Sequence, residues 1–131
     1  RVIGLREEPE NLLAELADNT LATTAGFVLQ AAVRRTPVLL DGVAAIAAAL
    51  IAYQVQPRAV RWMAAAGTTT DPAHALAMTT MGLRGVLDVA VATGDGLAGL
   101  IALPALRAAA RLAAENPVSP EPDEPSEPED D

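Results

Sequence analysis

The chain has 131 residues, no cysteine and one histidine. It contains nine arginines and 17 acidic residues, which gives a formal net charge of −8. This length suits one ordinary domain. The negative charge argues against a nucleic-acid partner, because such binding depends on neutralising phosphates. The absent thiols and the lone imidazole exclude a disulfide framework, a thiolate zinc site and a multi-histidine metal site.

Two helices with a short strand between them are predicted in the first half of the chain. Apolar residues recur at helical spacing over residues 10–34, with a possible break at Asp18, and Pro37 follows their end. The continuous apolar residues 38–40 are typical of a buried parallel strand. Residues 43–55 are rich in alanine and predict a helix.

A second strand and another helix follow. Residues 59–66 predict the strand. Asp71 followed by proline is typical of a helix start, because aspartate caps the free amides and proline fits the first helical position. This helix is predicted to run to Met81, with Gly82 at its left-handed end. We interpret His74, in its first turn, as a structural histidine rather than a ligand or a catalytic group.

The last elements repeat the same order. A third strand is predicted at residues 86–91, a tight turn at residues 94–96, and a helix over residues 97–115, which Pro104 either kinks or divides. Apolar strands that alternate with helices predict an α/β fold, a Rossmann-like parallel sheet with right-handed crossover helices. Three strands make a small sheet, so we expect it to be part of a larger domain.

The end of the chain differs in composition from the rest. Residues 115–131 hold eight acidic residues, no basic residue and five of the ten prolines. Such a segment has too little apolar surface to fold. We therefore predict an α/β domain over residues 1–115 and a disordered acidic tail over residues 116–131. A solvating tail is the preferred interpretation, and a docking segment for a basic partner is the alternative.

The apolar runs do not predict a membrane span. The charge-free run over residues 42–54 is too short to cross a bilayer, and the run over residues 86–106 contains Asp88, Asp95 and Pro104. We expect a cytoplasmic protein with no membrane partner.

The candidate site lies at the predicted carboxyl ends of the strands, where open parallel sheets bind ligands. Turns with Gly42, Gly94 and Gly96 permit close approach of the backbone, and the neighbouring hydroxyls and helix N-termini suit an anionic or ribosyl ligand. Asp41 and Asp95 are the carboxylates available for acid–base chemistry. A carboxylate base works near neutrality when burial raises its pKa.

The pattern Gly94-x-Gly96-x-x-Gly99 has the form of a dinucleotide-binding motif. Asp95 would place a negative charge against a pyrophosphate, and no strand follows to present an acidic residue at the expected distance. We do not favour dinucleotide binding.

Four sequence runs together resemble one enzyme family. They are R-T-P-V-L-L-D-G at residues 35–42, D-P-A-H-A-L-A at residues 71–77, G-D-G at residues 94–96, and A-L-P followed by A-R-L within residues 102–112. The chain resembles the nicotinate-nucleotide–dimethylbenzimidazole phosphoribosyltransferases over residues 9–115, with the motifs at the separations found in that family. The acidic tail lies outside the resemblance.

The resemblance implies transfer of the 5-phosphoribosyl group of nicotinate mononucleotide to 5,6-dimethylbenzimidazole. The products are α-ribazole phosphate, used for the lower ligand of cobalamin, and nicotinate. By position, Asp95 matches the family's general base, Asp41 and Thr69 match groups at the ribose phosphate, and Thr93 lies against the base pocket. The family implies no metal, no organic cofactor and a homodimer.

Several residues depart from the family pattern. Asp95 and Asp71 each stand where the family has glutamate, Leu97 replaces a threonine, Ala98 replaces a glycine, and Ala66-Gly67 replaces a serine–histidine pair. Family chains are more than twice as long, so the chain resembles the C-terminal part of the enzyme. The alternatives are a non-catalytic module that binds a ribotide or an azole base and docks through its acidic tail, and a structural fragment.

Overall fold

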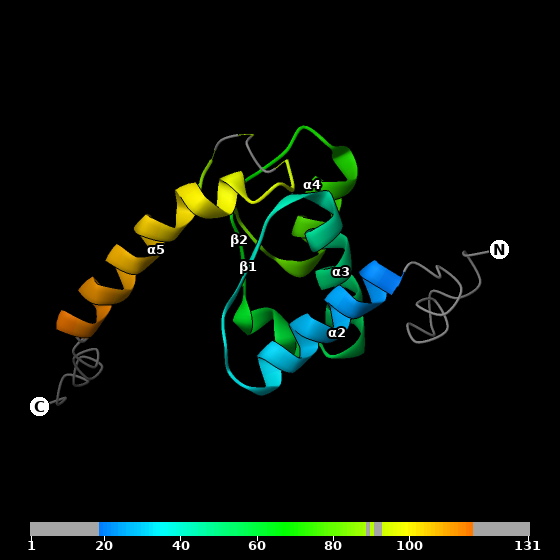
Figure 1. Ribbon diagram of the computed structural model, residues 1–131, viewed down its shortest axis with the longest axis horizontal. Coiled ribbons are helices and arrows are strands. Elements are labelled where there is room, and N and C mark those ends of the chain that lie inside the picture. Colours follow the sequence, from blue (N-terminus) through cyan, green and yellow to red (C-terminus); the bar gives the residue numbers. More distant parts are fainter. Residues whose placement is uncertain (1–18, 89, 91–92, 117–131) are drawn as a thin grey trace, which may run out of the picture.

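The computed structural model describes residues 19–88, 90 and 93–116 and shows helices on both faces of a small parallel sheet (Figure 1). The chain order is α2 (Asn19–Val33), β1 (Val38–Leu40), α3 (Gly42–Val55), a 3-10 helix η2 (Pro57–Trp62), β2 (Met63–Ala65), α4 (Pro72–Met81) and α5 (Leu97–Glu115). The part of the first predicted helix before Asn19 and the acidic tail beyond residue 116 lie outside the described residues.

The sheet has two hydrogen-bonded strands, with Val38 of β1 opposite Met63 of β2. Side chains alternate between its faces, as the pleat requires. Leu40 and Met63 belong to the main hydrophobic cluster beneath α2, α3 and α4, whereas Leu39 and Ala66 pack in a second cluster against α5. The predicted α/β class with parallel pairing is confirmed, in a smaller sheet than expected.

The predicted third strand at residues 86–91 is wrong over its described part. The chain makes one isolated parallel bridge, between Ala65 and Gly85, and then bends. The amide of Val86 still donates to the Ala65 carbonyl at 2.8 Å. A Cβ on Gly85 would lie 2.8 Å from the Leu87 carbonyl oxygen, so the backbone folds over the glycine there and leaves the extended path. Residues 89, 91 and 92 lie outside the described residues.

The predicted strand over residues 59–66 begins too early, because its first part is the 3-10 helix η2. Pro57 occupies the first turn of η2, where its fixed φ and missing amide proton are tolerated. The Gln56 side chain caps this turn by accepting a hydrogen bond from the Arg58 amide at 3.4 Å. Extended structure starts only at Met63, and Trp62 ends the 3-10 turn rather than lying in a strand.

The helices confirm the sequence prediction where their ends are determined locally. Asp71 accepts a hydrogen bond from the Ala73 amide at 2.7 Å, which caps α4 as predicted. Gly82 closes α4 with φ 67° in the left-handed region. The predicted helix over residues 43–55 is α3, and Pro104 lies inside an unbroken α5 rather than dividing it.

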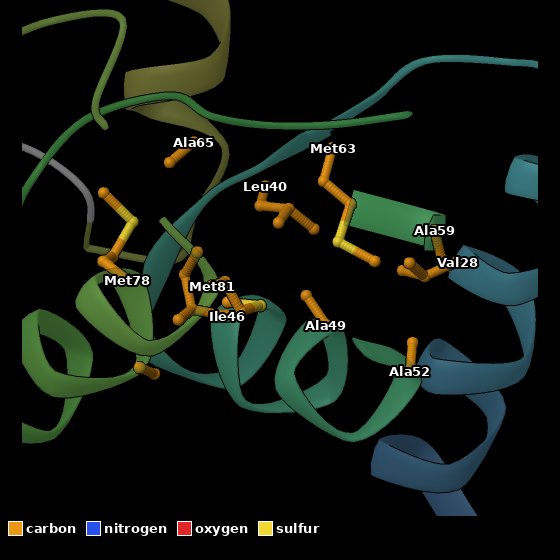
Figure 2. Packing of buried hydrophobic residues seen from close by; sticks show 11 residues of the cluster. Val28, Leu40, Ile46, Ala49, Ala52, Ala59, Met63, Ala65, Met78 and Met81 are labelled. Carbon is orange, nitrogen blue, oxygen red and sulfur yellow. The ribbon is translucent and has the colours of Figure 1, made fainter. Parts of the chain in front are cut away.

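The main core is built largely from small side chains, in keeping with the 29 alanines of the chain. Figure 2 shows Val28 of α2, Met63 of β2 and Met81 of α4 pointing toward Ile46 and the alanines of α3. A neighbouring cluster joins α2 and α3 through Ala25, Ala48 and Ile51. Alanine lets helices approach closely, so α3 packs between its neighbours. Tyr53 is the one aromatic residue of α3.

Helix α5 is attached to this body only through its first turns. Ala98 and Ala102 are fully buried against the sheet, and the rest of the helix projects away from the body (Figure 1). Leu100 is 70% exposed and Leu112 is 61% exposed. Within the described residues, α5 is the helix long and apolar enough to cross a membrane, by length and composition alone.

Candidate functional site

Asp41 lies at the carboxyl end of β1, where the chain turns into α3. Its backbone is extended, and its side chain does not cap α3. Instead, Oδ2 accepts a hydrogen bond from the Gly99 amide in the first turns of α5, at 3.1 Å and 58 residues along the chain. The other oxygen, Oδ1, is buried and has no hydrogen-bond partner among the described residues. The carboxylate thus faces the positive ends of two helices, with one acceptor unused.

The turn at Gly42 meets the turn at Gly94 backbone to backbone. Gly42 has φ +83°, a conformation that L side chains rarely adopt, and a Cβ there would lie 2.7 Å from the Gly94 nitrogen. Gly94 itself has φ +89°. The absence of side chains at both positions lets the Asp41 turn and the Thr93–Gly96 turn come together, although the predicted strand before the second turn does not form over its described part.

Asp95 is exposed and ionised. One of its oxygens, Oδ1, accepts hydrogen bonds from the Thr93 hydroxyl at 2.8 Å and from the Leu97 amide at 3.1 Å. The Thr93 hydrogen bond, followed by that of Leu97, lowers the pKa of Asp95 below its ordinary value of 3.8. The expectation of a carboxylate base with a pKa raised by burial is therefore not met at this residue. Gly96 follows with φ 87° and forms the N-cap of α5.

Thr69 lies beyond the carboxyl end of β2, at the same edge of the sheet. Its hydroxyl accepts a hydrogen bond from the Asp71 amide at 3.1 Å. Among the described residues, this local hydrogen bond is the one that Thr69 makes, and no hydrogen bond joins it to Asp41 or Asp95. The structure thus brings together the turns at residues 41–42 and 93–96, while Thr69 is placed at the same edge by topology alone.

A cavity of about 250 Å³ opens between α2 and these turns. It is lined by three residues of α2 and by residues of the strand-end turns and α3, namely Thr20, Leu21, Thr24, Asp41, Ala44, Ala45 and Gly94. Hydroxyls beside a carboxylate suit a polyhydroxylated ligand, but the volume lies below the ~300–1,000 Å³ of typical small-molecule sites. The cavity is therefore part of a site rather than a complete pocket.

Sequence reasoning did not find Thr20 and Thr24. The available signal was their spacing of four residues, which places both hydroxyl groups on one face of a helix. The Thr24 hydroxyl donates to the Thr20 carbonyl at 2.7 Å, as threonine commonly does within helices.

Neither a described cluster of metal-binding side chains nor His74 belongs to this geometry. No group of three or more metal-binding side chains occurs among the described residues. His74 is 2% exposed on the inner face of α4, so its ring offers almost no surface to a ligand.

Comparison with protein families identifies what this chain is similar to. The sequence model of a phosphoribosyltransferase family matches residues 2–119. The nicotinate-nucleotide–dimethylbenzimidazole phosphoribosyltransferase of Corynebacterium glutamicum is 41% identical over 112 residues, which are 86% of this chain and 31% of that protein. The protein of the same name from Mycobacterium ulcerans is 47% identical over 102 residues, 78% of this chain and 28% of that protein.

A solved structure shows the same fold. The crystal structure of CobT from Thermus thermophilus matches 81% of this chain and 32% of that chain, with a TM-score of 0.74 and 33% sequence identity. The chain therefore spans less than a third of the length of the curated relatives named above.

Proposed function

Because the chain belongs to this phosphoribosyltransferase family, we propose that it forms the C-terminal part of an enzyme that transfers phosphoribose from nicotinate mononucleotide to 5,6-dimethylbenzimidazole. The products are α-ribazole phosphate and nicotinate, and the reaction serves cobalamin biosynthesis. The named relatives carry this activity in their names. In this proposal, the rest of the site comes from the part of the enzyme that corresponds to the relatives' sequence outside the matched region.

One observation carries the proposal. The turns at residues 41–42 and 93–96 converge at the carboxyl end of β1 and leave a polar cavity beside Asp41. The start of α5 faces this edge, where its Leu97 and Gly99 amides donate hydrogen bonds to Asp95 and Asp41. This arrangement suits a ribose phosphate, and the small cavity volume agrees with a site that is completed elsewhere.

In the proposed reaction, one nitrogen of dimethylbenzimidazole attacks C1′ of the ribose and forms a new C–N bond. The bond from C1′ to the nicotinate nitrogen breaks, and nicotinate leaves with its electron pair. The azole proton becomes acidic as the ring gains positive charge, and the Asp95 carboxylate accepts it. A lowered pKa keeps Asp95 ionised at neutral pH and ready for this step, although it makes the group a weaker base.

The other residues position the substrates. We assign Asp41, Gly42 and Thr69 to the ribose phosphate, with Gly94 and Gly96 permitting close approach of the backbone. We assign Thr93 to the base pocket, where its hydrogen bond also orients Asp95. The proposed enzyme needs no cofactor and no metal. It is a cytoplasmic homodimer without a nucleic-acid or membrane partner.

The test is Asp95→Asn in the complete protein that carries this chain. Removing a general base costs roughly 100-fold or more in rate, so nicotinate release, followed by chromatography, should fall by at least about that factor. Asp88→Asn is the matched control, since Asp88 is also an exposed carboxylate. Its variant should keep the unmodified rate.

Two outcomes would contradict the proposal. Unchanged nicotinate release by Asp95→Asn would remove this residue from the chemistry. Binding of both substrates without any release by the unmodified protein would favour a non-catalytic ribotide-binding module.

A further inference from the structure

The edge of the sheet opposite the candidate site carries a second concave surface. A groove of about 360 Å³ runs between the end of α2 and η2. We call it the amino-edge groove, because both elements directly precede a strand. It is lined mainly by apolar side chains together with one arginine and the partly buried Trp62, the full set being Leu29, Ala32, Val33, Gln56, Arg58, Ala59 and Trp62.

Positive charge gathers around this groove. Arg58 lines the groove and Arg61 belongs to the same 3-10 helix, whereas Arg34, which follows α2 together with Arg35, lines a separate cavity beside Phe27. All four are exposed, and none forms an ion pair with another described residue. Among the described acidic residues, Asp41, Asp71 and Asp95 lie at the opposite, carboxyl edge, Asp88 follows the bridge at Gly85, and Glu115 ends α5. An aromatic groove bordered by arginines selects an acidic, partly apolar partner.

The acidic tail of the same chain has the matching chemistry. Prolines recur every third residue at Pro122, Pro125 and Pro128, and acidic residues recur with the same period at Glu121, Glu124 and Glu127. A polyproline II helix has three residues per turn, so this period places prolines on one edge and carboxylates on the next. Proline-rich segments in that conformation dock into aromatic-lined grooves.

We propose that the tail of this chain, residues 117–131, binds in the amino-edge groove as a polyproline II segment. The proline edge packs on Trp62 and the apolar side chains of α2. The acidic edge pairs with Arg58 and Arg61. The tail is then a docking segment whose basic partner is its own domain, and this inference is independent of the proposed phosphoribosyl transfer.

The distal end of the tail can reach the groove, whereas only residues 116–120 separate Glu121 from the end of α5. Helix α5 has 19 residues and so measures ~28 Å, and its first turns contact the carboxyl end of β1. The three-residue strands add ~10 Å back to the amino edge. The 15 residues of the tail span ~46 Å in polyproline II conformation. The straight distance from the end of α5 to the amino edge is shorter than the sum of the helix length and the strand length. The reason is that α5 and the strands run from their contact at an angle to each other (Figure 1).

Trp62 is the single tryptophan of the chain, so its fluorescence reports on the groove without a label. The full chain is compared with a chain that ends at Asn116, after circular dichroism has shown equal helix content. We expect acrylamide to quench Trp62 more readily in the shortened chain. A synthetic peptide of residues 117–131 should restore the protection. Its dissociation constant should rise roughly tenfold between 50 and 500 mM NaCl, because salt screens surface charges.

Charge variants locate the binding surface. Arg58→Glu should weaken binding of the tail peptide by about tenfold or more, since it places a like charge in the groove. Arg84→Glu is the matched control, because Arg84 is an exposed arginine outside the groove, and it should leave the affinity within about twofold. A peptide with Glu121, Glu124 and Glu127 changed to Gln should bind as weakly as the native peptide binds Arg58→Glu.

Four results would overturn the proposal. The first is equal acrylamide quenching of Trp62 with and without the tail. The second is an equal loss of affinity for the tail peptide in Arg84→Glu and Arg58→Glu, and the third is a loss of affinity in Arg107→Glu on α5 alone. The fourth is protection of Trp62 that increases with protein concentration in the full chain, which would place the tail on a second copy instead.

Discussion

Helices α3 and α5 have similar composition and opposite surroundings. Both are rich in alanine and leucine or isoleucine, and each lacks an acidic residue in its first turn. Six residues of α3 are buried, among them Ile46 and Ala49, whereas α5 buries only Ala98 and Ala102. The contact partners explain the difference, because α3 lies against α2, α4 and η2, while α5 touches the sheet with one end.

The comparison shows that the apolar composition of a helix indicates how much surface it can bury. It does not indicate which other elements cover that surface. The chain spans less than a third of the relatives named above. Helix α5 carries exposed apolar side chains, including Leu100 and Leu112. It is therefore the part of the chain whose apolar surface is least covered by the chain itself. In the α3 region, by contrast, six residues of the helix are buried by other parts of this chain.

The largest effect is expected at the junction of the two regions. Gly42→Ala places a Cβ against the Gly94 backbone and forces an L side chain into a left-handed conformation. We expect a loss of about 3–5 kcal/mol in the free energy of unfolding, measured by urea denaturation.

Gly26→Ala is the control for that substitution, since a Cβ at Gly26 meets no atom within 4 Å. In helix α2 it should stabilise the chain by about 0.5–1 kcal/mol. If both variants behave alike, close contact at Gly42 does not join the two turns.

A pair of truncations tests the comparison of α3 with α5 directly. Ile46 is 1% exposed, and Ile46→Ala should cost about 2–4 kcal/mol through lost burial and a cavity. Leu100 is 70% exposed, and Leu100→Ala should change the free energy of unfolding by less than about 0.5 kcal/mol. Equal costs in thermal or urea denaturation would mean that α5 is covered as well as α3.

The smallest effect concerns the turn that leads into α5. Thr93→Val removes the hydrogen bond that contributes most to the lowered pKa of Asp95, so this pKa should rise toward 3.8. A carboxyl-carbon NMR titration measures it, and Thr70→Val, at another exposed threonine, should leave it unchanged.

The sign of the pH dependence follows from that direction. Because folding lowers the pKa of Asp95, the ionised carboxylate stabilises the start of α5 above pH 3.8, and this contribution is lost as the pH falls through the lowered pKa. Thr93→Val should shrink the contribution. An unchanged titration in that variant would show that the Thr93 hydroxyl does not hold Asp95.

Sequence reasoning succeeded where one short segment determines the structure. Asp71 and Gly82 mark the ends of α4 by their own hydrogen bonds and dihedral angles, and both were predicted. It failed at residues 86–88, where the chain leaves the extended path and Gly85 lies close to Gly67, a contact between segments 18 residues apart that local sequence does not reveal. It also failed at residues 59–62, where the turn that starts at Pro57 continues further than the apolar pattern indicates.

The site was predictable in part for the same reason. Gly42 and Gly94 lie together as predicted, although the strand at residues 86–91 on which the prediction for Gly94 rested does not form over its described part. The rule that ligands bind at the carboxyl ends of strands says nothing about helix α2, so the hydroxyls of Thr20 and Thr24 were missed. The environment of Asp95 could not be predicted from the sequence either, because its pKa depends on the rotamer of the Thr93 side chain.

The small side chains at the contact of α2 with α3 have a consequence for the entropy of folding. Ala25 and Ala48 are buried there, and an alanine side chain has no rotamers to lose when it is fixed. The contact can therefore form without the loss of side-chain freedom that leucine or methionine would incur. The alanines also cannot adapt by changing rotamer, so Ile51 and Leu21 are the side chains of this cluster that can adjust without a shift of the backbone.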